Sequence, residues 1–212
     1  MLKLVAGLAI FFGVHSIRII APAWRDRMIA RLGAGGWKTV YSVASIVGFV
    51  LIVGGYAAAR IAPDPVIVYQ PPTWLRHVAF LLMLPVFPLL VAAYLPGRIK
   101  AAVKHPMLAA TKAWALAHLL ANGMLHDVLL FGGFLAWAVL DRISEGKRPQ
   151  PAASRAPGPI RNDVIAVVGG LVLYAIFVAW GHTRLIGIAQ QGLQPAAAAP
   201  PQAAGGATPP DL

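Results

Sequence analysis

The sequence predicts an all-α polytopic membrane protein, a helical bundle of about six transmembrane helices. Of its 212 residues, 58% are hydrophobic and only 12% are charged. Soluble domains average about 45–50% apolar and about 25% charged residues, so the composition excludes an ordinary soluble fold. The apolar residues also gather into separate runs, most of which approach the ~20 residues that a transmembrane helix needs.

The N-terminal half contains three of these runs, which predict helices over about Leu2–Ile20, Val40–Ala58 and Trp74–Tyr94. Residues 21–39 are basic and contain glycine, so we expect a loop there. A secretory signal peptide is the alternative interpretation of the first run. His15 and Arg18 argue against it, because the hydrophobic part of a signal peptide has no use for a charge at that depth.

Glycines and prolines within these helices predict how they pack and bend. Gly48, Gly54 and Gly55 predict close contacts between the second helix and a neighbour, because glycine lets two helix backbones approach. Pro85 and Pro88 predict a kink in the third helix, because each proline removes an internal hydrogen bond.

The C-terminal half predicts three more helices, over about Pro106–Ala121, His126–Leu140 and Asp163–Trp180. Asn122 and Gly123 predict a helix end and a tight turn, so the fourth and fifth helices should form a short hairpin. A polar loop should follow over residues 141–162. We expect residues 1–189 to form one transmembrane domain and the Pro- and Ala-rich residues 190–212 to be a disordered tail.

The charge pattern predicts partners and orientation. The net charge is +11, yet the basic residues form no single stripe and no nucleic-acid-binding module is present, so we expect the lipid bilayer and no nucleic acid as partner. Most basic residues lie in the odd-numbered loops between the predicted helices. The positive-inside rule then places those loops in the cytoplasm and both termini in the periplasm of a bacterial inner membrane.

The chain has no cysteine, so any metal or haem must be held by histidine, methionine or carboxylate. His15 and Arg18 lie three residues apart and share a face of the first helix. Imidazole is a ligand that haem iron takes readily, and a guanidinium could pair with a haem propionate or an anionic substrate. The alternative makes His15 a helix–helix hydrogen-bonding residue and lets Arg18 reach the membrane interface.

The fourth helix carries polar side chains on one face, among them Thr111, Trp114, His118 and Asn122. Ionisable groups inside a membrane cost about 2.5–3.5 kcal/mol each and mark functional sites. His118 is therefore a candidate axial haem ligand or proton-active group, and Trp114 could stack on a flat ligand. The alternative is a buried histidine that bonds to Asn122 or Thr111.

Four further ionisable residues are expected mainly at helix ends: His105, Lys112, His126 and Asp127. His105 precedes the fourth helix at the level of the headgroups. Lys112 either extends toward the interface or binds an anion. His126 and Asp127 either cap the fifth helix or form a proton relay.

Four segments together resemble the NnrU family of bacterial membrane proteins: FFGVHSIR, KHPML, KAWALAHLLANG and LLFGGFLAWAVLDR. This resemblance implies an association with denitrification and nitric oxide metabolism. The plant and cyanobacterial zeta-carotene isomerases share the domain, bind haem b between two histidines and isomerise a double bond. The resemblance places those ligands at His15 and His118. The isomerases have a cysteine three residues before the second histidine, where this chain has Ala115.

A more distant likeness is to isoprenylcysteine carboxyl methyltransferases, which also place a His-Pro motif before a helix hairpin. Their usual arginine is replaced here by Lys104, and their paired acidic motif is reduced to Glu145. Two functional classes remain open. One is a haem enzyme acting on a hydrophobic or small redox molecule. The other is a non-catalytic membrane factor, either a haem or nitric oxide sensor or an assembly partner of respiratory and denitrification proteins.

Overall fold

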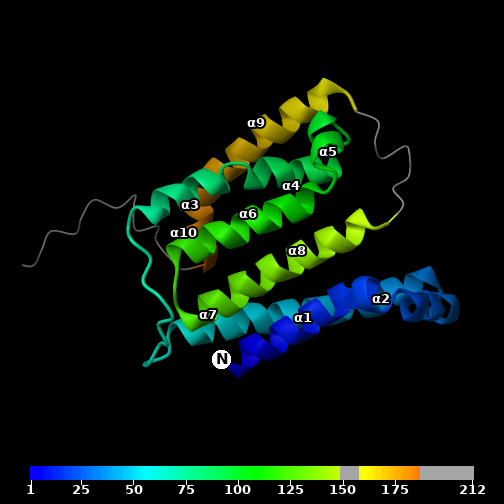
Figure 1. Cartoon of the computed structure of the whole chain (residues 1–212), viewed down its shortest axis with the longest axis horizontal. Helices are drawn as coiled ribbons and strands as arrows, with labels where there is room; N and C mark the ends of the chain where they lie inside the picture. The colour runs from blue at the N-terminus through cyan, green and yellow to red at the C-terminus, as the bar shows by residue number, and fades with distance from the viewer. Residues whose placement is uncertain (149–157, 187–212) are drawn as a thin grey trace, which may run out of the picture. The chain divides into compact units, whose positions relative to one another are not determined.

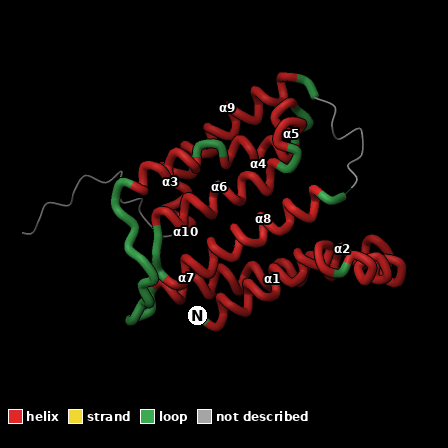
Figure 2. Tube along the Cα trace, in the orientation of Figure 1, coloured by secondary structure: helices red, strands yellow, loops and turns green. Residues whose placement is uncertain are grey.

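The structure, a computed structural model, describes residues 1–148 and 158–186, and these residues form an all-α fold (Figures 1 and 2). The helices in the N-terminal half are α1 (Leu2–Ile20), α2 (Pro22–Arg60), α3 (Leu75–Met83), α4 (Val86–Tyr94) and α5 (Arg98–Val103). The remaining ones are α6 (Pro106–Ala121), α7 (Leu125–Asp127), α8 (Gly133–Gly146), α9 (Ile160–Ile176) and α10 (His182–Ile186), with π-helical segments η1 (Val128–Gly132) and η3 (Phe177–Gly181). The predicted disordered tail, residues 190–212, lies outside the described residues.

The chain divides into two compact units, Met1–Tyr174 and Ala175–Leu212. In the first unit, α8 lies between α6 and the α1–α2 pair (Figure 1). The core of this unit gathers where these helices meet. It is built from Leu4, Leu8, Ile52, Ala115, Leu130 and Phe131. The described part of the second unit holds η3 and α10, which pack on each other.

The α1–α2 pair is held by backbone contacts at three glycines. A Cβ added to Gly7 would lie 2.6 Å from the Ile52 nitrogen, and one added to Gly55 would lie 2.3 Å from the Leu4 nitrogen. Gly48 is as tight, with its added Cβ 2.9 Å from the Phe11 nitrogen. The predicted contacts at Gly48 and Gly55 are therefore confirmed. Gly54 has nothing within 4 Å of an added Cβ, so its predicted contact is absent.

Helix α2 begins much earlier than predicted, because the basic segment expected as a loop is helical from Pro22. Gly33 interrupts it with φ 72° and ψ 164°, a conformation that residues with a Cβ rarely adopt. The chain turns at this glycine, so that the ring of Trp24 packs edge-on against Trp37 at 5.8 Å. Residues 21–39 were expected to be a loop because of their basic composition. They are mostly helical, and the turn at Gly33 leads into the apolar part of α2.

The third predicted helix is broken, as its prolines predicted. α3 ends at Met83 and α4 begins at Val86, on either side of Pro85. Helix α9 packs closely on α4, because a Cβ added to Gly170 would lie 2.4 Å from the Pro88 nitrogen. Helix α9 therefore contacts α4 at Pro88, just after the break at Pro85.

Helix α5 was not predicted. Its first backbone amides, those of Arg98 and Ile99, donate to the Asp163 carboxylate at 3.0 and 2.9 Å. The cap comes from the start of α9, far away in the sequence, which is why the local sequence gave no helix signal.

The fourth predicted helix matches α6 at both ends, and the turn after it is also confirmed. Gly123 lies against the segment before α3: its carbonyl accepts from the Val68 amide at 2.9 Å, and the Leu125 amide donates to Val66 at 2.8 Å. A Cβ on Gly123 would overlap the Tyr69 carbonyl oxygen. Glycine is therefore required here for close approach of two backbones, not for a left-handed turn.

The fifth helix is longer than predicted. It begins at Leu125, passes through the π-helical η1 and continues as α8 to Gly146, so residues 141–146 of the expected polar loop are helical. Gly133, at the start of α8, allows close packing, because a Cβ there would lie 2.9 Å from the Phe12 ring. The sixth predicted helix corresponds to α9, η3 and α10.

In the part of the chain that the structure describes, four helices are long and apolar enough to cross a membrane: Leu2–Ile20, Pro22–Arg60, Leu75–Tyr94 and Ile160–Arg184. Many large apolar side chains on them are exposed, including Val43, Val50 and Val172, and lipid is the environment that suits such a surface. The chain is therefore a multi-pass membrane protein. Helices α6 and α8, with 16 and 14 residues, are not among the four, so the structure supports four of the six predicted spans.

We predict that Gly55→Ala lowers the free energy of unfolding by about 1–3 kcal/mol, because the new methyl group overlaps the α1 backbone. Gly54→Ala is the matched control. It places the same methyl group in open space, and we expect unchanged stability or a gain of about 0.5–1 kcal/mol. Thermal unfolding in detergent compares the two variants. Equal stability of both would contradict the close α1–α2 contact.

Candidate functional site

His15 lies in the last third of α1, among aromatic rings. Its Nδ1 is 2.7 Å from the Phe11 carbonyl oxygen, and because a carbonyl can only accept, Nδ1 carries the proton. The imidazole stacks on the Phe11 ring at 4.0 Å and also contacts Tyr41 and Trp137. In the neutral ring, Nε2 then holds the lone pair that a metal would take.

His118 has the same arrangement near the end of α6. Its Nδ1 is 2.8 Å from the Trp114 carbonyl oxygen, and its ring stacks on Phe131 at 4.5 Å. Asn122 donates from Nδ2 to the His118 carbonyl at 2.9 Å and so caps this helix end. Asn122, one of the two partners predicted for the His118 ring in the alternative interpretation, bonds to the His118 backbone, and Nδ1 of the ring bonds to Trp114.

The two imidazoles lean toward each other along the bundle. Each bonds to the carbonyl four residues earlier, so each points toward the N-terminus of its own helix. Helices α1 and α6 run in opposite directions (Figure 1). Side chains that start near opposite ends of the bundle are thereby both directed toward its middle.

Aromatic rings link the two histidines. Phe134 of α8 contacts Phe11, beside His15, and Trp114, beside His118, each at 5.5 Å between ring centroids. Ala115 is fully buried in the adjoining core, so the position of the isomerase cysteine is filled here by packing. The surroundings of the two histidines are therefore aromatic, and the Phe134 ring lies between their neighbours Phe11 and Trp114.

Arg18, the predicted propionate or substrate partner, lies one turn beyond His15. Its Nη1 is 3.4 Å from Glu145 Oε1 of α8, and its side chain is 61% exposed. Arg148 pairs with the same glutamate and donates to the Arg18 carbonyl at 2.8 Å. These contacts join the last turns of α1 and α8, and they leave Arg18 at the surface of the bundle.

A polar cluster at the other end of the unit consists of Tyr56, His126 and Asp127, and the sequence indicated only the last two of these residues. Asp127 and His126 are 4% and 6% exposed. The Tyr56 hydroxyl donates to Asp127 Oδ1 at 2.6 Å, and His126 Nε2 lies 3.6 Å from the same oxygen. Asp127 Oδ2 accepts from the Met124 amide at 3.2 Å, which confirms the predicted capping role.

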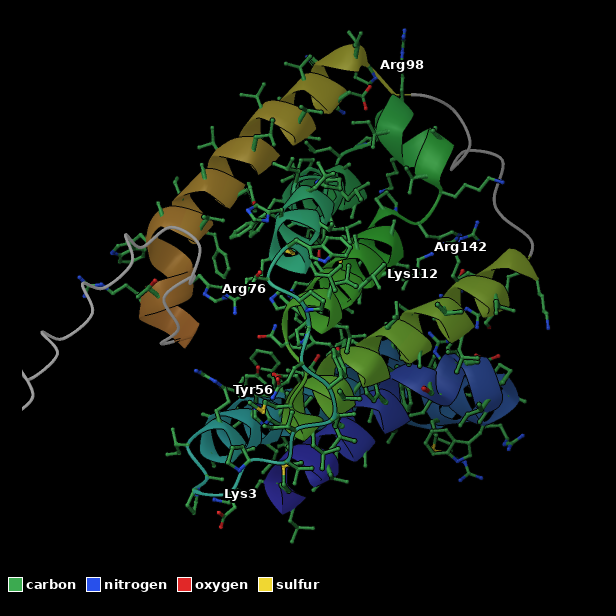
Figure 3. All side chains as sticks on the ribbon, turned by 60° about the vertical axis from the view of Figure 1, so that its left-hand side comes forward. Lys3, Tyr56, Arg76, Arg98, Lys112 and Arg142 are labelled. Atoms are coloured by element: carbon green, nitrogen blue, oxygen red, sulfur yellow. The ribbon has the colours of Figure 1, made fainter. Side chains whose placement is uncertain are left out.

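Tyr56 was missed because it lies within an apolar run of α2 and shares no local pattern with Asp127. A tyrosine in such a run is itself a weak signal, since a buried hydroxyl usually finds a partner. Figure 3 shows Lys3, Tyr56 and Arg76 toward one end of the molecule and Arg98, Lys112 and Arg142 toward the other.

The other predicted ionisable residues remain apart from the two histidines. His105 precedes α6, and its pKa is lowered below the ordinary value mainly by burial and further by the nearby Arg142 guanidinium. Lys112 is half-buried on α6 toward the Arg142 end. Within residues 1–148 and 158–186, no group of three or more His, Cys, Asp or Glu residues is arranged to hold a metal ion.

Fold and site together define a multi-pass membrane protein with two aromatic-enclosed histidines in its interior. The family model for NnrU protein matches residues 3–190, which is most of the chain. The chain belongs to the NnrU family, as its motifs indicated. Neither curated proteins nor solved structures give a match.

We predict that Tyr56→Phe lowers the free energy of unfolding by about 1–2 kcal/mol, because the buried Asp127 carboxylate loses a charge-assisted hydrogen bond. Tyr174→Phe removes the same atom from a 3.5 Å contact with the Phe80 carbonyl and should cost below about 0.5 kcal/mol. Chemical unfolding in detergent, followed by circular dichroism, measures both. Equal losses of unfolding free energy in the two variants would contradict a stabilising role of the Tyr56–Asp127 hydrogen bond.

Proposed function

We propose that this NnrU protein binds haem b, with His15 and His118 as the axial ligands. We further propose that α6 and the α7–α8 segment cross the membrane as the fourth and fifth of six spans, and that the membrane is a bacterial inner membrane with both chain termini in the periplasm. The function served is redox or nitric oxide chemistry associated with denitrification.

The observation that carries the proposal is the tautomer of the two histidines. In both, the bond from Nδ1–H to a backbone carbonyl fixes the ring and leaves Nε2 as the unprotonated nitrogen. Metal-ligating histidines commonly donate their other ring N–H to a carbonyl or carboxylate in this way, and the bond fixes the orientation of the ring. Both rings also lie within an aromatic shell inside apolar helices, where a haem would be shielded from water.

When bound, haem b would supply one-electron chemistry, and nitric oxide could bind the iron only in place of one of the two histidines. The residues of this chain hold and shield it. Phe11 and Trp114, the rings beside the two histidines, would line the bound haem, and Phe134, which contacts both of them, would pack next to it. Arg18 lies at the surface one turn from His15, where exchange of Glu145 for a propionate is possible.

Within this proposal, the non-catalytic class, a haem or nitric oxide sensor or an assembly partner of denitrification proteins, is the first candidate. A haem-dependent isomerase of a hydrophobic polyene is the second, favoured by the positions of the two histidines. Turnover of a polyene by the reduced protein selects the isomerase. Loss of nitrite or nitric oxide reduction in a deletion strain, without turnover by the purified protein, selects the first class.

We predict that the protein, purified in detergent after expression with added haem precursor, shows the Soret band of a six-coordinate haem. The double variant His15→Ala, His118→Ala should lose at least about nine-tenths of this band. His105→Ala is the matched control, since His105 lies outside the aromatic shell, and it should keep the band. An unchanged spectrum in the double variant would contradict the assignment.

A second prediction concerns Phe134. If haem lies between the histidines, Phe134→Ala opens that space, so haem content should stay the same or rise although the apo protein loses about 3–5 kcal/mol of stability. Haem content is measured by pyridine haemochrome assay and stability by thermal unfolding. A parallel fall of both quantities would show that haem binds elsewhere.

A further inference from the structure

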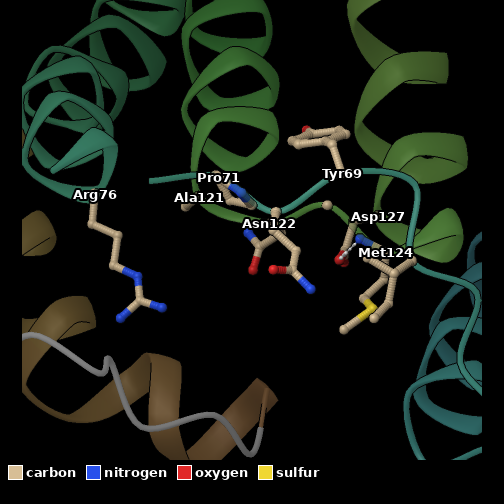
Figure 4. Close-up of a pocket in the computed structure, with 10 residues that line it drawn as sticks. Tyr69, Pro71, Arg76, Ala121, Asn122, Met124 and Asp127 are labelled. Carbon is tan, nitrogen blue, oxygen red and sulfur yellow. Dashed lines mark hydrogen bonds between the residues drawn. The ribbon is translucent and has the colours of Figure 1, made fainter. Parts of the chain in front are cut away.

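A pocket of about 340 Å³ lies at the Asn122 end of the bundle, away from His15 (Figure 4). Its volume is within the ~300–1,000 Å³ typical of small-molecule sites. Three segments line it. They are the stretch before α3 (Ile67, Tyr69, Gln70, Pro71), the first turns of α3 (Arg76), and the turn from α6 into α7 (Ala121–Met124 and Asp127).

The wall of the pocket is rigid. The Val68 and Tyr69 amides donate to the Gly123 carbonyl, and Ile67 and Met124 form an antiparallel bridge. The Tyr69 hydroxyl donates to the Leu119 carbonyl and fixes the ring of that tyrosine against α6. A pocket framed by these bonds is preformed, so a ligand need not order the chain in order to bind.

The polar groups of the pocket have two different characters. Arg76 lies on the side opposite Asp127, with Asn122 between them (Figure 4). Arg76 provides hydrogen-bond donors and a positive charge. The Asp127 carboxylate provides an acceptor, and it is connected through its bond with the Tyr56 hydroxyl to the interior of the unit.

The residues beside the pocket indicate its level in the membrane. Trp74, two residues before Arg76, is 61% exposed, and exposed tryptophans next to apolar spans mark the interface between hydrocarbon and water. Polar and apolar groups line the pocket together, from Arg76 and Asn122 to Ile67 and Met124. The ligand should therefore combine a polar headgroup with apolar attachments and reach the site from the membrane.

The charges of Arg76 and Asp127 indicate which of these ligands the pocket suits. Arg76 and Asp127 balance each other, which disfavours a phosphate or another anion. The Asp127 oxygens already accept from Tyr56 and Met124, and His126 Nε2 lies 3.6 Å from one of them, so one further donor can complete the four acceptor positions of the carboxylate. A dihydroxybenzene ring satisfies both sides, because one hydroxyl donates to Asp127 while the opposite oxygen accepts from Arg76.

We propose that this pocket binds the headgroup of a membrane quinol, with Asp127 accepting the hydrogen bond of one hydroxyl and Arg76 donating to the other oxygen. The site goes beyond the proposed haem function and does not require it. Binding of the quinol is all that is proposed, and no electron transfer is included.

The test is a titration of the detergent-purified, haem-free protein with decylubiquinol under anaerobic conditions and, separately, with decylubiquinone. Tryptophan fluorescence reports binding. We expect saturable binding of both forms. Asp127→Asn should weaken quinol binding about tenfold and should not weaken quinone binding, because only the quinol donates a proton to the carboxylate and the Asn amide can itself donate to a quinone oxygen. Arg76→Gln should weaken both about tenfold, and the matched Arg98→Gln, at the other end of the unit, should weaken neither.

Three results would overturn the proposal. They are the absence of saturable quinol binding to the wild-type protein, an equal effect of Asp127→Asn on both forms, and displacement of the quinol by phosphatidylethanolamine at equal mole fraction, which would identify a lipid headgroup site. If Asp127→Asn does not fold, as circular dichroism would show, the comparison of Arg76→Gln with Arg98→Gln decides, since both arginines lie near the surface.

Discussion

The hydrogen bond between Tyr56 and Asp127 joins the two parts of the first unit. Glycine contacts hold α1 on α2, and a shared apolar core packs this pair against α6 and α8. A buried carboxylate left without its donor costs about 1–3 kcal/mol or more, and this penalty favours the one alignment in which Asp127 reaches Tyr56. The Phe131 ring lies against both Tyr56 and His118, at 6.2 and 4.5 Å. The position of the candidate haem ligand is therefore tied to this bond.

The same end of α6 serves two sites. Asn122 closes the helix by donating to the His118 carbonyl, and it also lines the polar pocket. A change in the pocket can thus reach the helix turn that carries His118 without a long path through the protein. The opposite end is fixed differently, by the Arg18–Glu145–Arg148 ion pairs between α1 and α8. One end of the unit is held by a buried hydrogen bond, and the other by ion pairs in which Glu145 and Arg148 are partly buried and Arg18 is exposed.

Local signals were sufficient for some parts of this fold. Pro106 and Asn122 predicted both ends of α6, and Pro85 predicted the break between α3 and α4. Features that depend on distant contacts were missed. Helix α5 is capped by Asp163, α2 turns at Gly33 where composition suggested a loop, and Tyr56 finds its partner 71 residues away. Motif resemblance indicated His15 and His118 directly, whereas nothing in the sequence indicated that Phe134, although it lies in one of the family motifs, contacts an aromatic neighbour of each histidine.

The central claim is that one haem iron is held by imidazoles from α1 and α6. Near-infrared magnetic circular dichroism of the ferric protein tests it most directly, because the charge-transfer band identifies the pair of axial ligands. We expect the band of bis-imidazole ligation in the wild-type protein and its replacement by a high-spin, single-histidine spectrum in His15→Ala and in His118→Ala. A methionine–histidine band, or a bis-imidazole band that survives either substitution, would contradict the account.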